Sequence, residues 1–214
     1  DGEPQAPEPP GGGRPRDDGG DEPEPIDPPV VDPPPRPAKT VIKLADGRTA
    51  AIDYREIAPL AATRNMYLDA NGKLTNKSVE GHLASGVPGA VAGLTSALAK
   101  YGTLSLAQVM QPAIRLARDG FVVDTALAGS IARARDYVTR NSPNTPYYPN
   151  GQPIAAGARL VQPDFARSLQ AIADRGASAF YEGWIADSLV AEQQRGGGII
   201  TKADLKRYTP AYRT

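Results

Sequence analysis

The pattern of apolar and polar positions first indicates a β-hairpin, formed by residues 41–44 and 49–54. Both runs are short and rich in β-branched or small apolar residues, which is typical of strands. Asp46 and Gly47 lie between them. Asp-Gly is favoured at the centre of a type I′ turn because both central residues of that turn need positive φ. The pattern therefore predicts two antiparallel strands joined by a type I′ turn at Asp46-Gly47.

A helical spacing of apolar residues begins at Val91 and predicts a first helix over residues 91–100. The next helix starts at Ser105, because a Ser followed three residues later by Gln108 makes a capping box. Pro112 interrupts this run and has no amide hydrogen, so we expect a short first turn and then a kink or a restart of the helix. Its inward face is expected to carry Leu106, Val109, Met110, Ala113, Ile114 and Ala117.

The same spacing continues after residue 120 and predicts two more helices. Asp124 can cap a helix that extends to about Arg140. Residues 141–152 are rich in Pro, Asn and Tyr and indicate a loop. Pro163 suits the first turn of the following helix. The inward face of that helix is expected to carry Phe165, Ala166, Leu169, Ile172 and Ala173.

Two further helices are predicted near the end of the chain. Residues 184–194 form one, and the glycines at 196–198 end it. Thr201 and Asp204 start the other in capping-box style. The chain stops soon after this start, so we expect it to be a piece of a longer protein.

Residues 1–40 have a different composition from the rest of the chain. They hold 13 of the 22 prolines, with ten acidic and four basic residues and no aromatic residue. Such a segment cannot bury enough apolar surface to offset the entropy lost on ordering, so we expect a disordered arm. The arm is interpreted either as an unusual linker or as the product of a frame error in a GC-rich gene. Residues 41–214 are predicted to form the folded domain.

Composition and charge exclude several classes of protein. The chain has 24 Lys and Arg against 24 Asp and Glu, whereas nucleic-acid-binding proteins normally have a strong basic excess. Cysteine is absent, which excludes disulfides and thiolate metal sites. No apolar run approaches the roughly 18 residues of a membrane span. We therefore expect that the chain does not bind nucleic acid and contains no membrane span.

His82 is the single histidine, so a Ser-His-Asp hydrolase would have to use it. Ser85 is only three residues away, and the chain contains no G-x-S-x-G motif. A loop histidine bonded to backbone is the favoured interpretation. One histidine without cysteine also argues against a metal site.

A polar cluster, Asp53 to Glu56, follows the second predicted strand. Arg55 can bind a carboxylate through two parallel hydrogen bonds, which a lysine cannot do, and Glu56 can orient its guanidinium. From the residues alone, a surface ion pair at a strand end is the favoured alternative. In the arm, Pro34–Lys39 fits a P-x-x-P pattern, which is interpreted either as a spacer or as a recognition segment.

Several ordered motifs make residues 41–214 resemble the gamma-glutamyltranspeptidase family. The resemblance implies a helix-rich α+β part of an N-terminal-nucleophile hydrolase with a four-layer αββα core. It covers the middle of the large subunit only. The motifs are IDYREIAP at 52–59, ATRNMYLD at 62–69, HLASGVPG at 82–89, QPAI at 111–114, LARDGF at 116–121 and GIITKADL at 198–205.

This resemblance also implies an activity and a partner. Family members are precursors that cut themselves into a large and a small subunit, and the new terminal threonine of the small subunit is the nucleophile. Its own amine can act as the base. It takes the gamma-glutamyl group of glutathione or a related amide and passes it to water or to an amino-acid or peptide acceptor. No metal or organic cofactor is implied, and the location is periplasmic or extracellular.

The resemblance assigns a role to two residues of this chain. Arg55 matches the arginine that binds the α-carboxylate of the glutamyl group, with Glu56 as its support. The nucleophile is expected beyond residue 214, so we expect the chain alone to be inactive. A non-catalytic remnant, or an interaction protein that uses residues 28–39, is the alternative hypothesis.

Overall fold

The computed structural model describes residues 40–142 and 144–213, which belong to one compact unit. The predicted arm and its P-x-x-P segment lie outside the described residues, except for Thr40 at the start of β1. Strands β1 (Thr40–Lys43), β2 (Thr49–Asp53) and β5 (Ala211–Arg213) form an antiparallel sheet in the order β1-β2-β5. The last described residues therefore pair with the strand that directly precedes Arg55.

The hairpin between β1 and β2 is confirmed, but its turn differs from the prediction. Leu44 N–H donates to Arg48 O at 2.9 Å, which leaves a three-residue loop. Gly47 has a φ of 90°, whereas Asp46 stays at negative φ and accepts the Arg48 N–H through its side chain. The type I′ prediction was wrong because a three-residue loop needs only one left-handed residue, at its last position.

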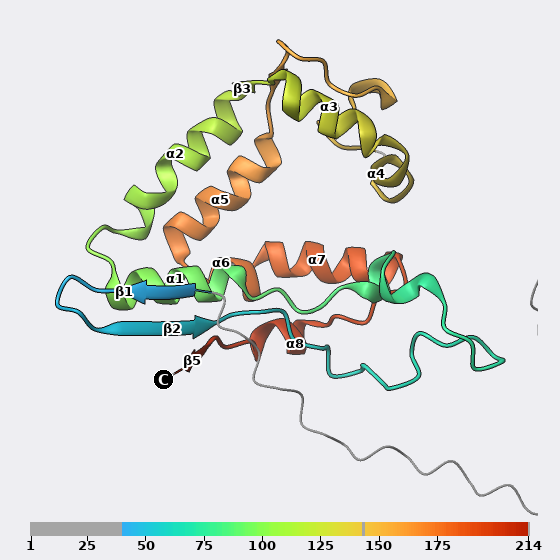
Figure 1. The fold of residues 1–214 in the computed structure, drawn as a ribbon, viewed down its shortest axis with the longest axis horizontal. Helices are drawn as coiled ribbons and strands as arrows, with labels where there is room; N and C mark the ends of the chain where they lie inside the picture. The colour runs from blue at the N-terminus through green and yellow to red at the C-terminus, as the bar shows by residue number, and fades with distance from the viewer. Residues whose placement is uncertain (1–39, 143, 214) are drawn as a thin grey trace, which may run out of the picture. The chain divides into compact units, whose positions relative to one another are not determined.

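Helix α1 (Ala90–Tyr101) contacts β2, and α2 (Leu106–Asp119) packs side by side with α5 (Pro163–Arg175) (Figure 1). The Ser105 capping box is present at the start of α2. The restart of the helix expected at Pro112 is not found, since α2 runs through that residue as one helix. Proline removes one backbone hydrogen bond there, and the packing of α2 along α5 outweighs that loss.

The inward faces predicted for α2 and α5 are correct only in part. Ile114 in α2 and Ile172 in α5 are buried, as expected. Val109 and Phe165, in contrast, are 46% and 53% exposed. Helical spacing identifies an apolar stripe, but each helix here covers only part of its stripe with the other.

A second small sheet and two helices follow α2. Strand β3 (Phe121–Val122) pairs with β4 (Arg159–Leu160), and α3 (Thr125–Arg133) is capped by Asp124. Helix α4 (Arg135–Asn141) is separate from α3, so the single helix predicted to extend to about Arg140 is wrong. A buried cluster forms here from Val123, Ile131, Tyr148, Ile154 and Leu160. Ile131 belongs to α3, and Val138 of α4 packs against the cluster.

The remaining helices are α6 (Ser178–Tyr181), α7 (Trp184–Arg195) and α8 (Lys202–Lys206). The predicted capping box of Thr201 and Asp204 starts α8. Short 3-10 turns occur at η1 (Asn76–Ser78), η2 (His82–Ala84) and η3 (Pro149–Gly151). The main buried cluster joins α1, α6, α7 and α8, and its members are Val87, Ala92, Tyr181, Ala186, Ile200, Leu205 and Tyr208.

Within the described part, no helix has both the length and the apolar character needed to cross a bilayer.

Candidate functional site

Arg55 lies two residues beyond the end of β2, at the point where the chain leaves the sheet. Ile52 and Asp53 are buried and fix this end of the strand, whereas the Arg55 side chain is 48% exposed. Two open grooves meet at Arg55. One has a volume of about 290 Å³ and is shared with Tyr208 and Arg213. The other has a volume of about 430 Å³ and is shared with Glu56 and residues of the 82–89 motif.

Arg55 and Glu56 form the ion pair that the sequence predicted as a possibility. Arg55 Nη2 donates to Glu56 Oε1 at 2.9 Å, and the Glu56 side chain is also 48% exposed. A guanidinium has five N–H donors, and this contact uses one of them. The pair therefore holds the side chain in place while the grooves give a ligand access to it.

The backbone of Arg55 is fixed on both sides. Its N–H donates to Asp53 Oδ1 at 3.1 Å, and its carbonyl accepts from the Tyr208 hydroxyl at 2.7 Å. Asp53 in turn accepts from Arg213 Nη2 of β5 at 2.7 Å. Burial, followed by the charges of Asp53 and Glu56, raises the pKa of Tyr208. The hydroxyl therefore keeps the proton that it donates to Arg55.

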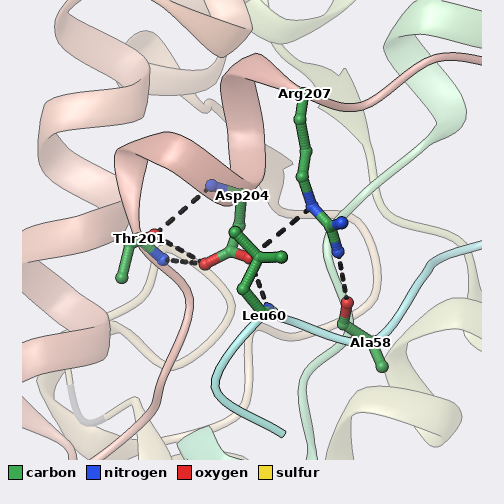
Figure 2. Close-up of polar contacts among 5 residues, drawn as sticks. All are labelled: Ala58, Leu60, Thr201, Asp204 and Arg207. Carbon is green, nitrogen blue, oxygen red and sulfur yellow. Dashed lines mark hydrogen bonds and ion pairs between the residues drawn. The ribbon is translucent and has the colours of Figure 1, made fainter.

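Figure 2 shows a second group of contacts, centred on the carboxylate of Asp204. Asp204 Oδ1 accepts from Leu60 N–H at 2.6 Å. Its Oδ2 accepts from the N–H and the hydroxyl of Thr201, at 2.9 and 2.6 Å. Arg207 Nη2 donates to Ala58 O at 3.1 Å, and its Nε lies 3.9 Å from Asp204 Oδ1. Helix α8 is therefore joined to the segment that follows Arg55.

Burial alone would raise the pKa of Asp204, but hydrogen bonds from Thr201 and Leu60 and the charge of Arg207 outweigh it and lower the pKa. The side chain of Asp204 has no exposed surface. A buried carboxylate is costly unless donors surround it. The donors found here keep Asp204 ionised at neutral pH.

His82 has a side-chain partner, and the predicted backbone bond was wrong. Its Nε2 lies 2.7 Å from Glu192 Oε1 of α7. Arg195 donates to the other oxygen of Glu192 at 2.8 Å. Arg195, together with His82, lowers the pKa of Glu192 to about 2. The contact joins η2 to α7. Glu192 lies 110 positions after His82, which is too far for a local sequence pattern to reveal the contact.

Among residues 40–142 and 144–213, no three His, Asp or Glu side chains form a group that could hold a metal ion. A larger cavity of about 730 Å³ lies between α1 and the start of α2, but its described lining has no charged side chain. Arg55 and Arg213 both line the smaller of the two grooves, and Arg55 also lines the larger of the two.

Sequence reasoning found Arg55 and Glu56 but missed the residues that hold them. Tyr208 and Arg207 contact residues about 150 positions earlier in the chain. The capping box identified Asp204 only as a helix start. No local pattern connects these residues to Arg55.

Comparison with known proteins shows which family this chain resembles. Residues 39–214 match the family described as gamma-glutamyltranspeptidase. The glutathione hydrolase proenzyme of Escherichia coli (strain K12) is 46% identical over 177 residues, which cover 81% of this chain and 30% of that protein. The acylase ACY 1 proenzyme of Pseudomonas sp. (strain V22) is 42% identical over 175 residues, or 78% of this chain and 31% of that protein.

The crystal structure of Helicobacter pylori gamma-glutamyltranspeptidase is similar to this chain with a TM-score of 0.79 and 40% identity. The match covers 82% of this chain and 51% of that one. Likeness to such structures confirms the predicted fold class, a helix-rich part of an N-terminal-nucleophile hydrolase. The chain spans about 30% of the length of the curated relatives that it matches first.

Proposed function

The chain belongs to the gamma-glutamyltranspeptidase family, and from that premise we propose that it is the middle part of the large subunit of a gamma-glutamyltransferase or glutathione hydrolase. The complete protein transfers the gamma-glutamyl group of glutathione, or of a related amide, to water or to an amino-acid or peptide acceptor. Arg55 binds the α-carboxylate of that group, and Glu56 orients Arg55.

The observation that carries this proposal is the position of Arg55. Its guanidinium is half-exposed at the meeting point of two grooves, and its backbone is held from both sides. A planar guanidinium with remaining donors matches the geometry of a carboxylate.

The reaction takes place between this subunit and a nucleophile from elsewhere. Bound through Arg55, the glutamyl group presents its γ-amide carbonyl to the terminal threonine of a small subunit, which attacks to give an acyl-enzyme. The amine leaves with a proton, and water or an acceptor amine then releases the glutamyl group. Arg55 contributes by holding the glutamyl group in one orientation, so that the attack of the threonine on the amide becomes effectively intramolecular.

The partner of this chain is then the small subunit from the same precursor. Support comes from the relatives, several of which are named as proenzymes. We place the assembled protein in the periplasm or outside the cell. On this account the 214-residue chain has no activity of its own.

Two other functions compete with this proposal. One is an acylase, because a protein named as an acylase is 42% identical over 175 residues. Similarity at this level therefore does not decide which acyl group the complete protein transfers. An acylase whose substrate lacks an α-carboxylate would not need Arg55. A non-catalytic remnant, or an interaction protein that uses the arm, would not need it either, and the family match gives these alternatives no support.

The test is a chimera in which residues 40–213 replace the matching segment of the Escherichia coli glutathione hydrolase proenzyme. Hydrolysis of a chromogenic gamma-glutamyl anilide gives kcat and KM, and gel electrophoresis reports self-cleavage. We expect Arg55→Lys to leave self-cleavage intact and to lower kcat/KM by about 100-fold, or about 2.7 kcal/mol, because the paired hydrogen bonds are lost.

The control is Arg48→Lys, at a side chain that is 74% exposed in the hairpin turn. It makes the same chemical change away from the grooves and should leave kcat/KM unaltered. If Arg55→Lys cleaves itself and hydrolyses the anilide as fast as this control, Arg55 does not bind the substrate carboxylate.

A further inference from the structure

The segment that carries Arg55 is almost without regular secondary structure. Between Tyr54 and Leu60, only Ile57 makes a bridge, in which its N–H and carbonyl pair with Val87. The peptide groups of such a segment must find partners elsewhere, because unpaired buried groups are costly. The segment therefore takes its position from whatever supplies those partners.

Apart from Val87 and Asp53, three partners come from one short region, α8 and the two residues after it. The Tyr208 hydroxyl donates to the carbonyl of Arg55, and Arg207 Nη2 donates to the carbonyl of Ala58. Asp204 accepts the Leu60 N–H. Figure 2 shows the last two contacts side by side, with Asp204 and Arg207 on one turn of helix facing the loop.

Asp204 does more than start its helix. A capping box requires one carboxylate oxygen to accept from the cap residue, and Oδ2 already does this with Thr201. The second oxygen, Oδ1, is directed at Leu60 across 144 positions of sequence. The 2.6 Å distance and the ionised acceptor indicate a charge-assisted bond between the buried Asp204 and the exposed Leu60.

We infer that Asp204, Arg207 and Tyr208, here named the α8 anchor, are positioning residues that place Arg55 for carboxylate binding. None of the three needs to touch substrate. Each holds a different peptide group within five residues of Arg55, so the anchor fixes both the position and the direction of the loop. A shift of about 1 Å in a binding group is enough to weaken catalysis greatly. This inference deepens the proposed function and rests on it for the role of Arg55.

The first arm of the test measures the anchor in the 214-residue chain itself. Amide hydrogen exchange, followed residue by residue, compares wild type with Asp204→Asn. Asn removes the negative charge and replaces one acceptor oxygen with a donor, so the Leu60 N–H either loses its acceptor or keeps a neutral and weaker one. We expect the Leu60 N–H to exchange at least about tenfold faster, with amides of α2 and α5 unchanged.

The matched control is Asp124→Asn, at the cap of α3, where Asp124 accepts the Leu127 N–H at 2.7 Å. Asn also caps helices well, and this exposed residue lies next to Val123 of the other buried cluster, away from α8. It should leave the exchange of residues 55–60 unchanged. Equal acceleration throughout the chain in Asp204→Asn, or no acceleration at Leu60, would overturn the anchor.

A second variant decides the question if Asp204→Asn does not fold. Arg207→Gln changes a side chain that is 42% exposed, so the fold is expected to survive. It removes the donor to Ala58 and the charge beside Asp204. We expect a local increase in exchange at residues 57–60. Unchanged exchange there would refute the role of Arg207 and, with Asp204→Asn unfolded, the anchor as a whole.

The second arm uses the chimera described above. We expect Asp204→Asn to raise KM for the gamma-glutamyl anilide by about tenfold or more with a smaller change in kcat, since donor binding weakens. A role in stability alone would instead lower the yield of active enzyme at unchanged KM. Asp124→Asn again serves as the control.

The two arms separate failure of the anchor from failure of the proposed function. If Arg55→Lys raises KM but Asp204→Asn does not, the anchor is wrong and the function stands. If neither variant changes KM while exchange at Leu60 increases, Asp204 holds the loop but the loop does not bind the substrate, and the positioning role is overturned together with the function.

Discussion

Tyr181 supplies a cap that α1 does not make for itself. The residue before α1 is Gly89, which has no side chain to accept the free N–H groups of the first turn. The Tyr181 hydroxyl instead accepts from Ala92 N–H at 3.2 Å and donates to Pro88 O at 2.8 Å. Tyr181 is only 7% exposed, so water does not replace these bonds. Tyr181→Phe removes both of them while keeping the ring.

The expected loss of stability follows from the two backbone groups left without a partner, Ala92 N–H and Pro88 O. A buried polar group deprived of its partner costs about 1–3 kcal/mol, and the small size of the hydroxyl limits relaxation. We therefore expect Tyr181→Phe to lower the free energy of unfolding by about 2 kcal/mol. For a folded part of this size, that corresponds to a fall in Tm of about 4–8 °C.

Urea unfolding followed by circular dichroism measures this change, with Tyr212→Phe as the control. Tyr212 bonds Ser96 through its hydroxyl at the surface, and it is 42% exposed, so its variant should stay within about 0.5 kcal/mol of wild type. Equal stabilities of the Tyr181 and Tyr212 variants would refute the capping argument.

Alkaline titration gives an independent check on the same side chain. Burial raises the pKa of Tyr181 to about 12, above its ordinary value of 10. The neutral hydroxyl therefore contributes stability that is complete below pH 10 and is lost as the pH rises from 10 toward 12. The stability of wild type should fall over this pH range, and the fall should be smaller in Tyr181→Phe because the contribution of this hydroxyl is absent.

Two further predictions concern acid stability and close packing. The pKa of Glu192 is lowered to about 2 by Arg195 and His82, so stability should fall as the pH drops from 4.5 toward 2, and Glu192→Gln should flatten that part of the curve measured by thermal unfolding. Gly89→Ala should lower the free energy of unfolding by at least about 1–3 kcal/mol, because its Cβ would lie 2.2 Å from the backbone carbonyl of Tyr54. Gly129→Ala, with only an ordinary contact inside α3, should be neutral or stabilising by up to about 1 kcal/mol in the same urea experiment.

Features that depend on neighbours within a few residues were predicted well from the sequence. The capping boxes at Ser105 and Thr201 and the cap at Asp124 are all present. Each depends on one side chain and an N–H group three residues away. Features that depend on what lies across the fold were predicted less well. Phe165 has the spacing of a core residue, but no described element covers it.

The candidate site shows the same division. Arg55 and Glu56 are adjacent in sequence, so their ion pair was within reach of local reasoning. The assignment of Arg55 to carboxylate binding came from the family resemblance and stays a prediction. Tyr208 and Asp204 carry no signal of their own for this site, because a tyrosine and a capping aspartate are common in helical ends. Only the three-dimensional structure brings them to Arg55.

The two buried clusters imply an order of assembly during synthesis. The cluster around Tyr148 uses residues 121–160 alone, so closing it involves short loops that form early. The cluster around Tyr208 joins residues 57–92 to residues 177–208, and β2 gains its second neighbour, β5, only when Arg213 has been made. The short-range cluster can therefore form before α8 has been synthesised, whereas the loop that carries Arg55 obtains its contacts from Asp204, Arg207 and Tyr208 only after about 150 further residues have been added.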